Sequence, residues 1–169
     1  MHRGQLQVSF FEEPCPYWEL EWTARVAEVL DIAVAGAEQD NDLAQFRRML
    51  QMRAVDIVQP DVCYIGGLLR TLTVARMAAE LGVPCIPHSA NLSLVTVFTL
   101  HLMAAIANAG DFVEYSIEES DWISQWIEGL YQPRLEVVDG EVAVPAGPGW
   151  GVEIGSEWLE QAEVQVSTL

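Results

Sequence analysis

Five ionisable residues of types that occur in active sites recur at nearly equal intervals along the chain. They are Glu12, Glu38, Asp61, His88 and Glu114, and the intervals between them are 26, 23, 27 and 26 residues. Each follows a short apolar run of the kind that forms a buried strand. This spacing predicts a repeated structural unit that presents one reactive side chain per repeat.

The first two of these residues are carboxylates that would end neighbouring strands. Carboxylates without thiolates suit a hard cation such as Mg²⁺, so Glu12 and Glu38 are the predicted metal ligands. The pair Glu12 and Glu13 could instead be a solvated acidic loop, but the recurrence of a glutamate on the next strand favours the metal site. Glu13 faces the opposite side and is expected to support the ligands or to contact solvent.

Asp61 and His88 each follow an apolar run and a proline, on strands predicted to be neighbours. An aspartate beside a histidine fixes the tautomer of the ring and raises its pKa, which gives a general acid or base near neutral pH. The alternative is a buried, hydrogen-bonded histidine with no catalytic role. Glu114 is expected to hydrogen-bond the substrate or a developing oxyanion. His101 lies within an apolar helical stretch and is predicted to be structural.

The elements that must position these residues alternate between strand and helix. The predicted strands are Gln7–Phe11, Ile32–Ala35, Asp56–Gln59, Val83–Ile86 and a fifth that starts at Phe112–Val113. Helices are predicted at about 17–30 and 43–52, from Gly66-Gly67 to 81, and at about 92–108, and a hairpin with an Asp139-Gly140 turn at 134–144. Such alternation is typical of an α/β protein with a parallel sheet. Reactive groups at five successive strand ends favour part of a (β/α)₈ TIM barrel over a doubly wound sheet.

The composition excludes several classes of function. The chain has 169 residues, a net charge of −17, eight arginines and no lysine. This charge disfavours nucleic acid and membrane surfaces as partners, and the missing lysine excludes Schiff-base and P-loop lysine chemistry within the chain. Three cysteines without a C-x-x-C pair, and no apolar leader, predict a cytoplasmic protein with reduced thiols.

The motifs around these residues resemble those of the enolase superfamily, specifically the mandelate racemase/muconate lactonizing enzymes and their acid-sugar dehydratase branch. The matching segments, which span the chain from about Phe10 onward, are Phe11–Pro14, Gly36–Gln39, Gln59–Asp61 with Gly66-Gly67, Pro87–Ser89 and Glu114-Tyr115. The resemblance implies that Glu12 and Glu38 are the second and third Mg²⁺ ligands. It implies that the Asp61–His88 dyad acts on the proton α to a substrate carboxylate, which Glu114 hydrogen-bonds from the eighth strand. The chain departs from the family at Ala37, where a glycine is usual.

The resemblance also implies which parts of such an enzyme the chain holds. Residues 1–132 would be strands four to eight with their helices, and residues 133–169 a hairpin and tail that pack on a capping domain. The first three barrel units, the capping domain, an aspartate ligand and a Lys-x-Lys pair are expected to lie outside the chain.

The implied function is a Mg²⁺-dependent dehydratase of a sugar acid. An inactive remnant or assembly module is an alternative, and a racemase is a third, which needs a second base. Unpaired strand edges predict a homo-oligomer or pairing with a complementary fragment.

Overall fold

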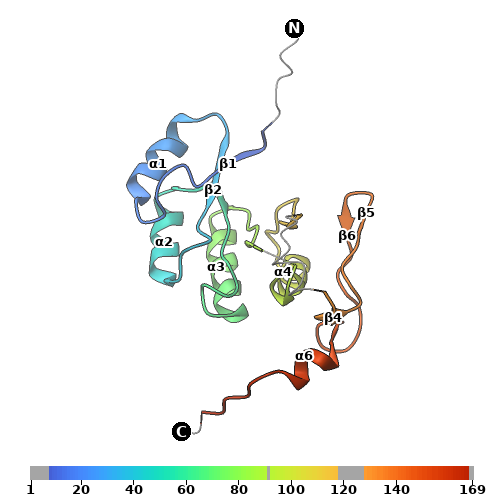
Figure 1. The fold of residues 1–169 in the computed structure, drawn as a ribbon. Coiled ribbons are helices and arrows are strands. Elements are labelled where there is room, and N and C mark those ends of the chain that lie inside the picture. Colours follow the sequence, from blue (N-terminus) through green and yellow to red (C-terminus); the bar gives the residue numbers. More distant parts are fainter. Residues whose placement is uncertain (1–7, 91, 118–127, 168–169) are drawn as a thin grey trace.

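The core of the molecule is a short parallel sheet. The computed structural model describes residues 8–90, 92–117 and 128–167. Strands β1 (Phe10–Glu12), β2 (Ala33–Gly36) and β3 (Ile57–Val58) are hydrogen-bonded in that order, and all run parallel. Between them lie helices α1 (Leu20–Val29) and α2 (Leu43–Gln51), and α3 (Leu68–Glu80) follows β3 (Figure 1).

The parallel ladder continues beyond β3 as two isolated bridges. Cys85 pairs with Val58, and Ala109 pairs with Cys85, both in parallel orientation. Helix α4 (Leu94–Ala105) connects these last two segments. Five consecutive segments of the chain are therefore laid side by side in one direction, each joined to the next by a helix, as expected for part of a β/α barrel.

Local sequence explains where the helices begin. The side chain of Asp42 accepts a hydrogen bond from the backbone N–H of Ala44, which caps the first turn of α2. Gly66 and Gly67 precede α3 with φ angles of 90° and 109°, in the left-handed region that favours glycine. These glycines therefore serve the tight turn between β3 and α3.

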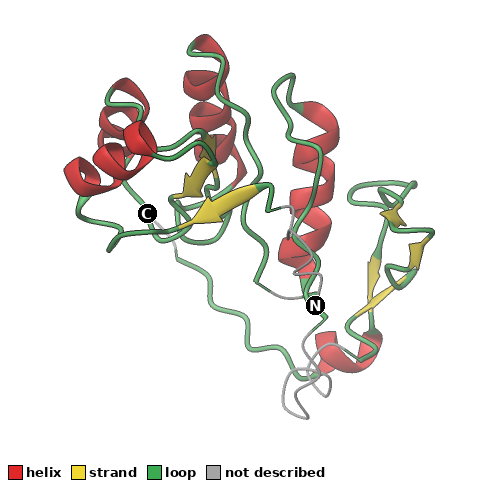
Figure 2. Cartoon of the chain, turned by 90° about the horizontal axis from the view of Figure 1, so that it is seen from above, coloured by secondary structure: helices red, strands yellow, loops and turns green. Residues whose placement is uncertain are grey.

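Helices α1 to α3 lie on one side of the sheet (Figure 2), and apolar side chains fill the space between the two layers. The fully buried members of this cluster include Val34, Phe46, Val58, Val74 and Cys85, each 0% exposed. A second cluster, formed by Val97, Leu100, Tyr131 and Leu135, packs α4 against the C-terminal segment.

The C-terminal segment is built from antiparallel pairs. Strands β5 (Val137–Val138) and β6 (Glu141–Val142) form the predicted hairpin, with Asp139 and Gly140 both in the left-handed region that a type I′ turn requires. Strand β4 (Tyr131–Gln132) pairs with β7 (Glu153–Ile154), and a short helix, α6 (Ser156–Glu160), follows. The pairing of β4 with β7 and the helix α6 were not predicted.

The prediction of a fifth strand at Phe112–Val113 is wrong by about three residues. The bridge lies at Ala109, and Phe112 is 62% exposed. The ladder bonds of this segment are made by Asn108, whose backbone oxygen accepts from Cys85, and by Gly110, whose N–H donates to the backbone oxygen of Cys85 at 3.1 Å. A Cβ atom at Gly110 would lie 2.6 Å from Cδ1 of the Ile86 side chain, so glycine leaves room for that side chain. The predicted helix at 17–30 begins later, at Leu20, and the one at 92–108 ends earlier, at Ala105. No helix in the described part of the chain is long and apolar enough to cross a membrane.

Candidate active site

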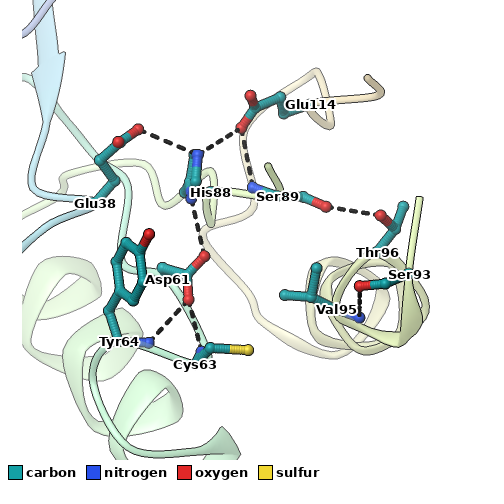
Figure 3. Close-up of polar contacts among 10 residues, drawn as sticks. All are labelled: Glu38, Asp61, Cys63, Tyr64, His88, Ser89, Ser93, Val95, Thr96 and Glu114. Carbon is teal, nitrogen blue, oxygen red and sulfur yellow. Dashed lines mark hydrogen bonds and ion pairs between the residues drawn. The ribbon is translucent and has the colours of Figure 1, made fainter. Parts of the chain in front are cut away.

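The reactive residues predicted from the sequence gather beyond the carboxyl ends of the parallel segments. Glu12 ends β1, and Glu38 follows β2 by two residues. Asp61 and His88 each lie three residues beyond the paired residues Val58 and Cys85. Figure 3 shows His88 at the centre of a group that contains Asp61, Glu38 and Glu114.

Asp61 and His88 form the predicted dyad. Nδ1 of His88 lies 2.8 Å from Oδ2 of Asp61, and the two side chains are 9% and 5% exposed. The other carboxylate oxygen, Oδ1, accepts hydrogen bonds from the backbone N–H groups of Cys63 and Tyr64 at 2.6 and 2.9 Å. The Asp61 carboxylate is thus fixed from both sides, and it fixes the orientation of the imidazole ring.

The pKa values of the dyad are shifted in opposite directions. The hydrogen bond that His88 donates to Asp61 raises the pKa of His88 against the effect of burial, and the charges of Glu114 and Glu38 raise it further. Burial alone would raise the pKa of Asp61, but the hydrogen bonds from His88, Tyr64 and Cys63 outweigh it and hold that pKa below its usual value. Both shifts favour the ion pair.

The second ring nitrogen of His88 faces two further carboxylates. Nε2 lies 3.2 Å from Oε2 of Glu38 and 3.6 Å from Oε2 of Glu114. With Nδ1 engaged by Asp61, Nε2 is the nitrogen that can exchange a proton with a molecule bound among these glutamates. This is the geometry that a general acid or base requires.

Carboxylates outnumber cations at this end of the sheet. Burial raises the pKa of Glu12 and the charge of Glu114 raises it further, whereas a hydrogen bond accepted from the Gln59 side chain lowers it. The pKa of Glu38 is also raised, by burial and by the charges of Glu13, Glu12 and Glu114, against the opposing effect of His88. Such mutual repulsion favours the binding of a cation.

The carboxylates fit Mg²⁺ by their chemistry, because oxygen donors of this kind are the ligands that Mg²⁺ prefers. Within the described ranges, no group of three or more His, Cys, Asp or Glu side chains is arranged to hold a metal ion. Glu38, one of the two predicted ligands, is paired with His88 in this structure.

The backbone at the predicted ligands has an unusual conformation. Glu13 and Ala37, which neighbour Glu12 and Glu38, have φ angles of 42° and 95°. Positive φ in residues other than glycine is costly and is concentrated at functional sites. Ala37 stands where a glycine is usual in the family that the sequence resembles, and its φ angle gives the physical reason for that preference.

Glu114 lies at the site, but on a different structural element from the one predicted. It lies on a loop, five residues beyond the bridge at Ala109, and is not at a strand end. Its Oε2 accepts a hydrogen bond from the backbone N–H of Ser89 at 2.9 Å. The hydroxyl of Ser89 is in turn hydrogen-bonded to Thr96 of α4 at 2.8 Å. The residue that follows His88 therefore positions Glu114 beside it.

Sequence reasoning assigned no role to Gln59, Ser89 or Tyr64, although all three contact predicted site residues. Gln59 and Ser89 belong to the same motifs as Asp61 and His88, so their positions in the sequence could have indicated that they lie at the site. Tyr64 had no such signal, and its ring stacks on His88 with the centroids 6.5 Å apart and the planes at 22°.

His101, predicted to be structural, contacts the C-terminal segment of the chain. Its Nε2 lies 2.9 Å from the backbone oxygen of Trp150, whose ring packs against it edge to face. Asp56, at the opposite end of its strand from Asp61, accepts a hydrogen bond from the backbone N–H of Val34 at 2.9 Å.

Comparison with known proteins places these features in a family. The sequence model of the family described as "Enolase C-terminal domain-like" matches residues 2–158. The chain belongs to this family. Its similarity to enzymes of the mandelate racemase and muconate lactonizing group agrees with the resemblance recognised from the motifs.

Several relatives are dehydratases of sugar acids. The chain is 32% identical over 157 residues to an arabinonate dehydratase of Saccharolobus solfataricus, covering 93% of this chain and 40% of the relative. The chain thus spans about two fifths of the length of this curated relative.

Solved structures of similar proteins also match this chain over part of their length. A candidate racemase from Roseobacter denitrificans has a TM-score of 0.89 and 54% identity, covering 95% of this chain and 44% of that protein. An L-talarate dehydratase from Polaromonas sp. JS666, complexed with Mg and L-glucarate, has a TM-score of 0.75 and 27% identity, covering 96% and 42%. The chain is therefore an α/β protein that corresponds to part of enolase-superfamily barrels.

Proposed function

We propose that the chain forms part of the active site of a Mg²⁺-dependent acid-sugar dehydratase. The observation that carries the proposal is the orientation of His88, whose Nδ1 is held by Asp61 at 2.8 Å while Nε2 faces Glu38 and Glu114. The sugar-acid dehydratases among the relatives support the same chemistry.

In the proposed reaction, His88 moves one proton. Neutral Nε2 takes the proton from the carbon α to the substrate carboxylate, and the Asp61 carboxylate stabilises the imidazolium that results. The imidazolium then returns this proton to the β-hydroxyl as the carbon–oxygen bond breaks. Water leaves, an enol remains that rearranges to the 2-keto-3-deoxy acid, and His88 regains its initial protonation state.

The glutamates would bind the metal ion and the substrate carboxylate. Glu12 and Glu38 would hold Mg²⁺, together with a ligand from outside the described residues. When bound, Mg²⁺ supplies positive charge that stabilises the negative charge developing on the substrate carboxylate. Glu114, held by the N–H of Ser89, would hydrogen-bond that carboxylate from the other side.

The proposal is tested by replacing the corresponding C-terminal part of the Roseobacter denitrificans protein with this chain. The chimera is incubated in D₂O with Mg²⁺ and a panel of sugar acids, and NMR follows both deuterium at the α carbon and 2-keto-3-deoxy acid. We expect product formation that His88→Asn abolishes. His101→Asn is the matched control, because His101 lies outside the site.

Two results would contradict the proposal. If His88→Asn forms product at the rate of the unmodified chimera, the proton is moved by another group. If no acid in the panel yields a 2-keto-3-deoxy acid while the chimera is folded, as judged by circular dichroism, the site does not perform this chemistry.

A racemase is the second candidate, because the neighbour with 54% identity is described as a candidate racemase. Racemisation needs an acid or base on each face of the α carbon, and the described residues offer one such histidine dyad. The same experiment separates the two functions, since a racemase would incorporate deuterium and invert the α carbon without forming the keto acid.

A further inference from the structure

The imidazole of His88 lies between two carboxylates that follow neighbouring strands. The loop after β2 carries Glu38, whose Oε2 lies 3.2 Å from Nε2 of the ring, and the turn after β3 carries Asp61, whose Oδ2 lies 2.8 Å from Nδ1. Figure 3 shows the ring between these two side chains. The spacing of the loop and the turn therefore decides whether both carboxylates reach the ring at once.

One side chain of α3 joins the same loop and turn. Nε of Arg70 donates to the backbone oxygen of Ile65 at 2.6 Å, and its Nη2 donates to the backbone oxygen of Asn41 at 2.9 Å. Ile65 lies four residues after Asp61, and Asn41 lies three residues after Glu38. The guanidinium group therefore bridges the loop that carries one carboxylate and the turn that carries the other.

Hydrogen bonds within the turn connect Ile65 to the Asp61 carboxylate. The N–H of Ile65 donates to the backbone oxygen of Asp61 at 3.0 Å. The N–H groups of Cys63 and Tyr64, which lie between these two residues, donate to Oδ1 of Asp61 at 2.6 and 2.9 Å. A restraint on the backbone of Ile65 therefore acts on the carboxylate that orients His88.

The shape of the arginine side chain suits this bridge. Its planar guanidinium directs several N–H donors at fixed angles, whereas a lysine ammonium is a single point charge. The side chain lies against the turn itself, since a Cβ atom added at Gly66 would lie 3.5 Å from Cδ of Arg70. Hydrogen bonds from a charged donor are also stronger than those between neutral groups.

We propose that Arg70 is a positioning residue, which holds the Glu38 loop and the Asp61 turn at the spacing that His88 requires. It acts through two backbone oxygens and is not itself proposed to contact the substrate. This inference rests on the proposed function, because proton transfer at His88 is the step that slows when the loop and the turn move apart.

Hydrogen exchange on the full chain, followed by ¹⁵N NMR, tests whether Arg70 holds the turn. Arg70→Gln is compared with Arg76→Gln, which removes the same charge from an exposed position on the same helix. We expect the N–H groups of Cys63 and Tyr64 to exchange about tenfold faster in Arg70→Gln and at the original rate in Arg76→Gln. The N–H of Val58, which is bonded within the core, should keep its exchange rate in both variants.

Kinetics of the chimera described above test whether this positioning matters for the reaction. Arg70→Gln should lower kcat by about tenfold and leave KM unchanged, because it displaces the acid or base without removing a group that binds the substrate. Arg70→Lys, whose ammonium is a single point donor, should lose part of this rate. Arg76→Gln should keep the rate of the unmodified chimera.

Three results would overturn the inference. They are equal exchange rates of Cys63 and Tyr64 in the two glutamine variants, an unchanged kcat in Arg70→Gln, and a fall in kcat that is accompanied by equally faster exchange at Val58, which would indicate a general loss of stability. If the unmodified chimera forms no product, the proposed function fails, and the exchange rates alone decide whether Arg70 holds the turn.

Discussion

The hydrogen bond between Asp61 and His88 leads to a stability prediction that depends on pH. Asp61→Asn keeps an oxygen for the N–H groups of Cys63 and Tyr64 and removes only the charged bond to His88. A hydrogen bond to a charged group contributes about 1.5–3 kcal/mol, so we expect the free energy of unfolding to fall by about 2 kcal/mol near pH 5.5. Asp61→Ala loses all three bonds and should cost at least twice as much.

The pH range follows from the two pKa shifts. The pKa of His88 is raised in the folded chain, so its contribution is complete below the ordinary value of 6.5 and is lost as the pH rises through the raised value. The pKa of Asp61 is lowered, so its contribution is complete above 3.8 and is lost as the pH falls through the lowered value. The effect of Asp61→Asn is therefore largest between about pH 4 and 6.5.

Urea unfolding followed by tryptophan fluorescence measures this difference. The experiment is done in EDTA from about pH 4 to pH 9, and a loss of about 2 kcal/mol should lower the urea midpoint by about 1 M. Asp31→Asn, at an exposed position, is the control for the change in net charge. A loss that stays constant across this range, or that equals the loss in Asp31→Asn, would show that the ion pair does not stabilise the fold.

Three further predictions follow from individual contacts. The buried hydroxyl of Thr99 has no hydrogen-bond partner among the described residues, so Thr99→Val should raise the unfolding free energy by about 1 kcal/mol in urea titrations, and a loss would indicate a hidden partner. Gly110→Ala would press a methyl group against Ile86 and should lower the unfolding free energy by about 1–3 kcal/mol in the same titrations. An unchanged unfolding free energy would mean that the backbone at Gly110 can shift to make room. Calorimetry should find weak Mg²⁺ binding that Glu38→Gln weakens further, because the proposed site has two carboxylates and the described residues show no group of three or more metal-binding side chains; a tight, stoichiometric site would contradict this.

The strand–helix alternation and the gathering of reactive residues were predictable because both follow from simple periodicities. Short apolar runs marked the strands, and one charged residue after each run marked the same edge of the sheet. His88 and Asp61 came together because equivalent positions on adjacent parallel strands lie side by side.

The remaining features depend on contacts between distant segments. The fifth strand was misplaced because its ladder bonds are made at Asn108 and Gly110, which lack the apolar pattern that predicts a strand. Glu114 was assigned to a strand end, but a loop carries it and the N–H of Ser89 holds it. The stacking of Tyr64 on His88 likewise joins residues 24 positions apart through tertiary structure alone.

Backbone hydrogen bonds between neighbouring segments continue beyond the short strands, up to or next to the candidate site residues. The N–H of Glu13 donates to Ala35 at 3.0 Å, that of Gln59 donates to Gly36 at 2.9 Å, and that of His88 donates to Pro60 at 3.3 Å. Main-chain bonds, which do not depend on side-chain identity, therefore set the spacing between one reactive position and the next. In evolutionary terms, each βα unit is an exchangeable carrier of a single functional group. Mutation can replace the chemistry of one unit while its neighbours keep their places, so new activities are accessible to this scaffold through few substitutions.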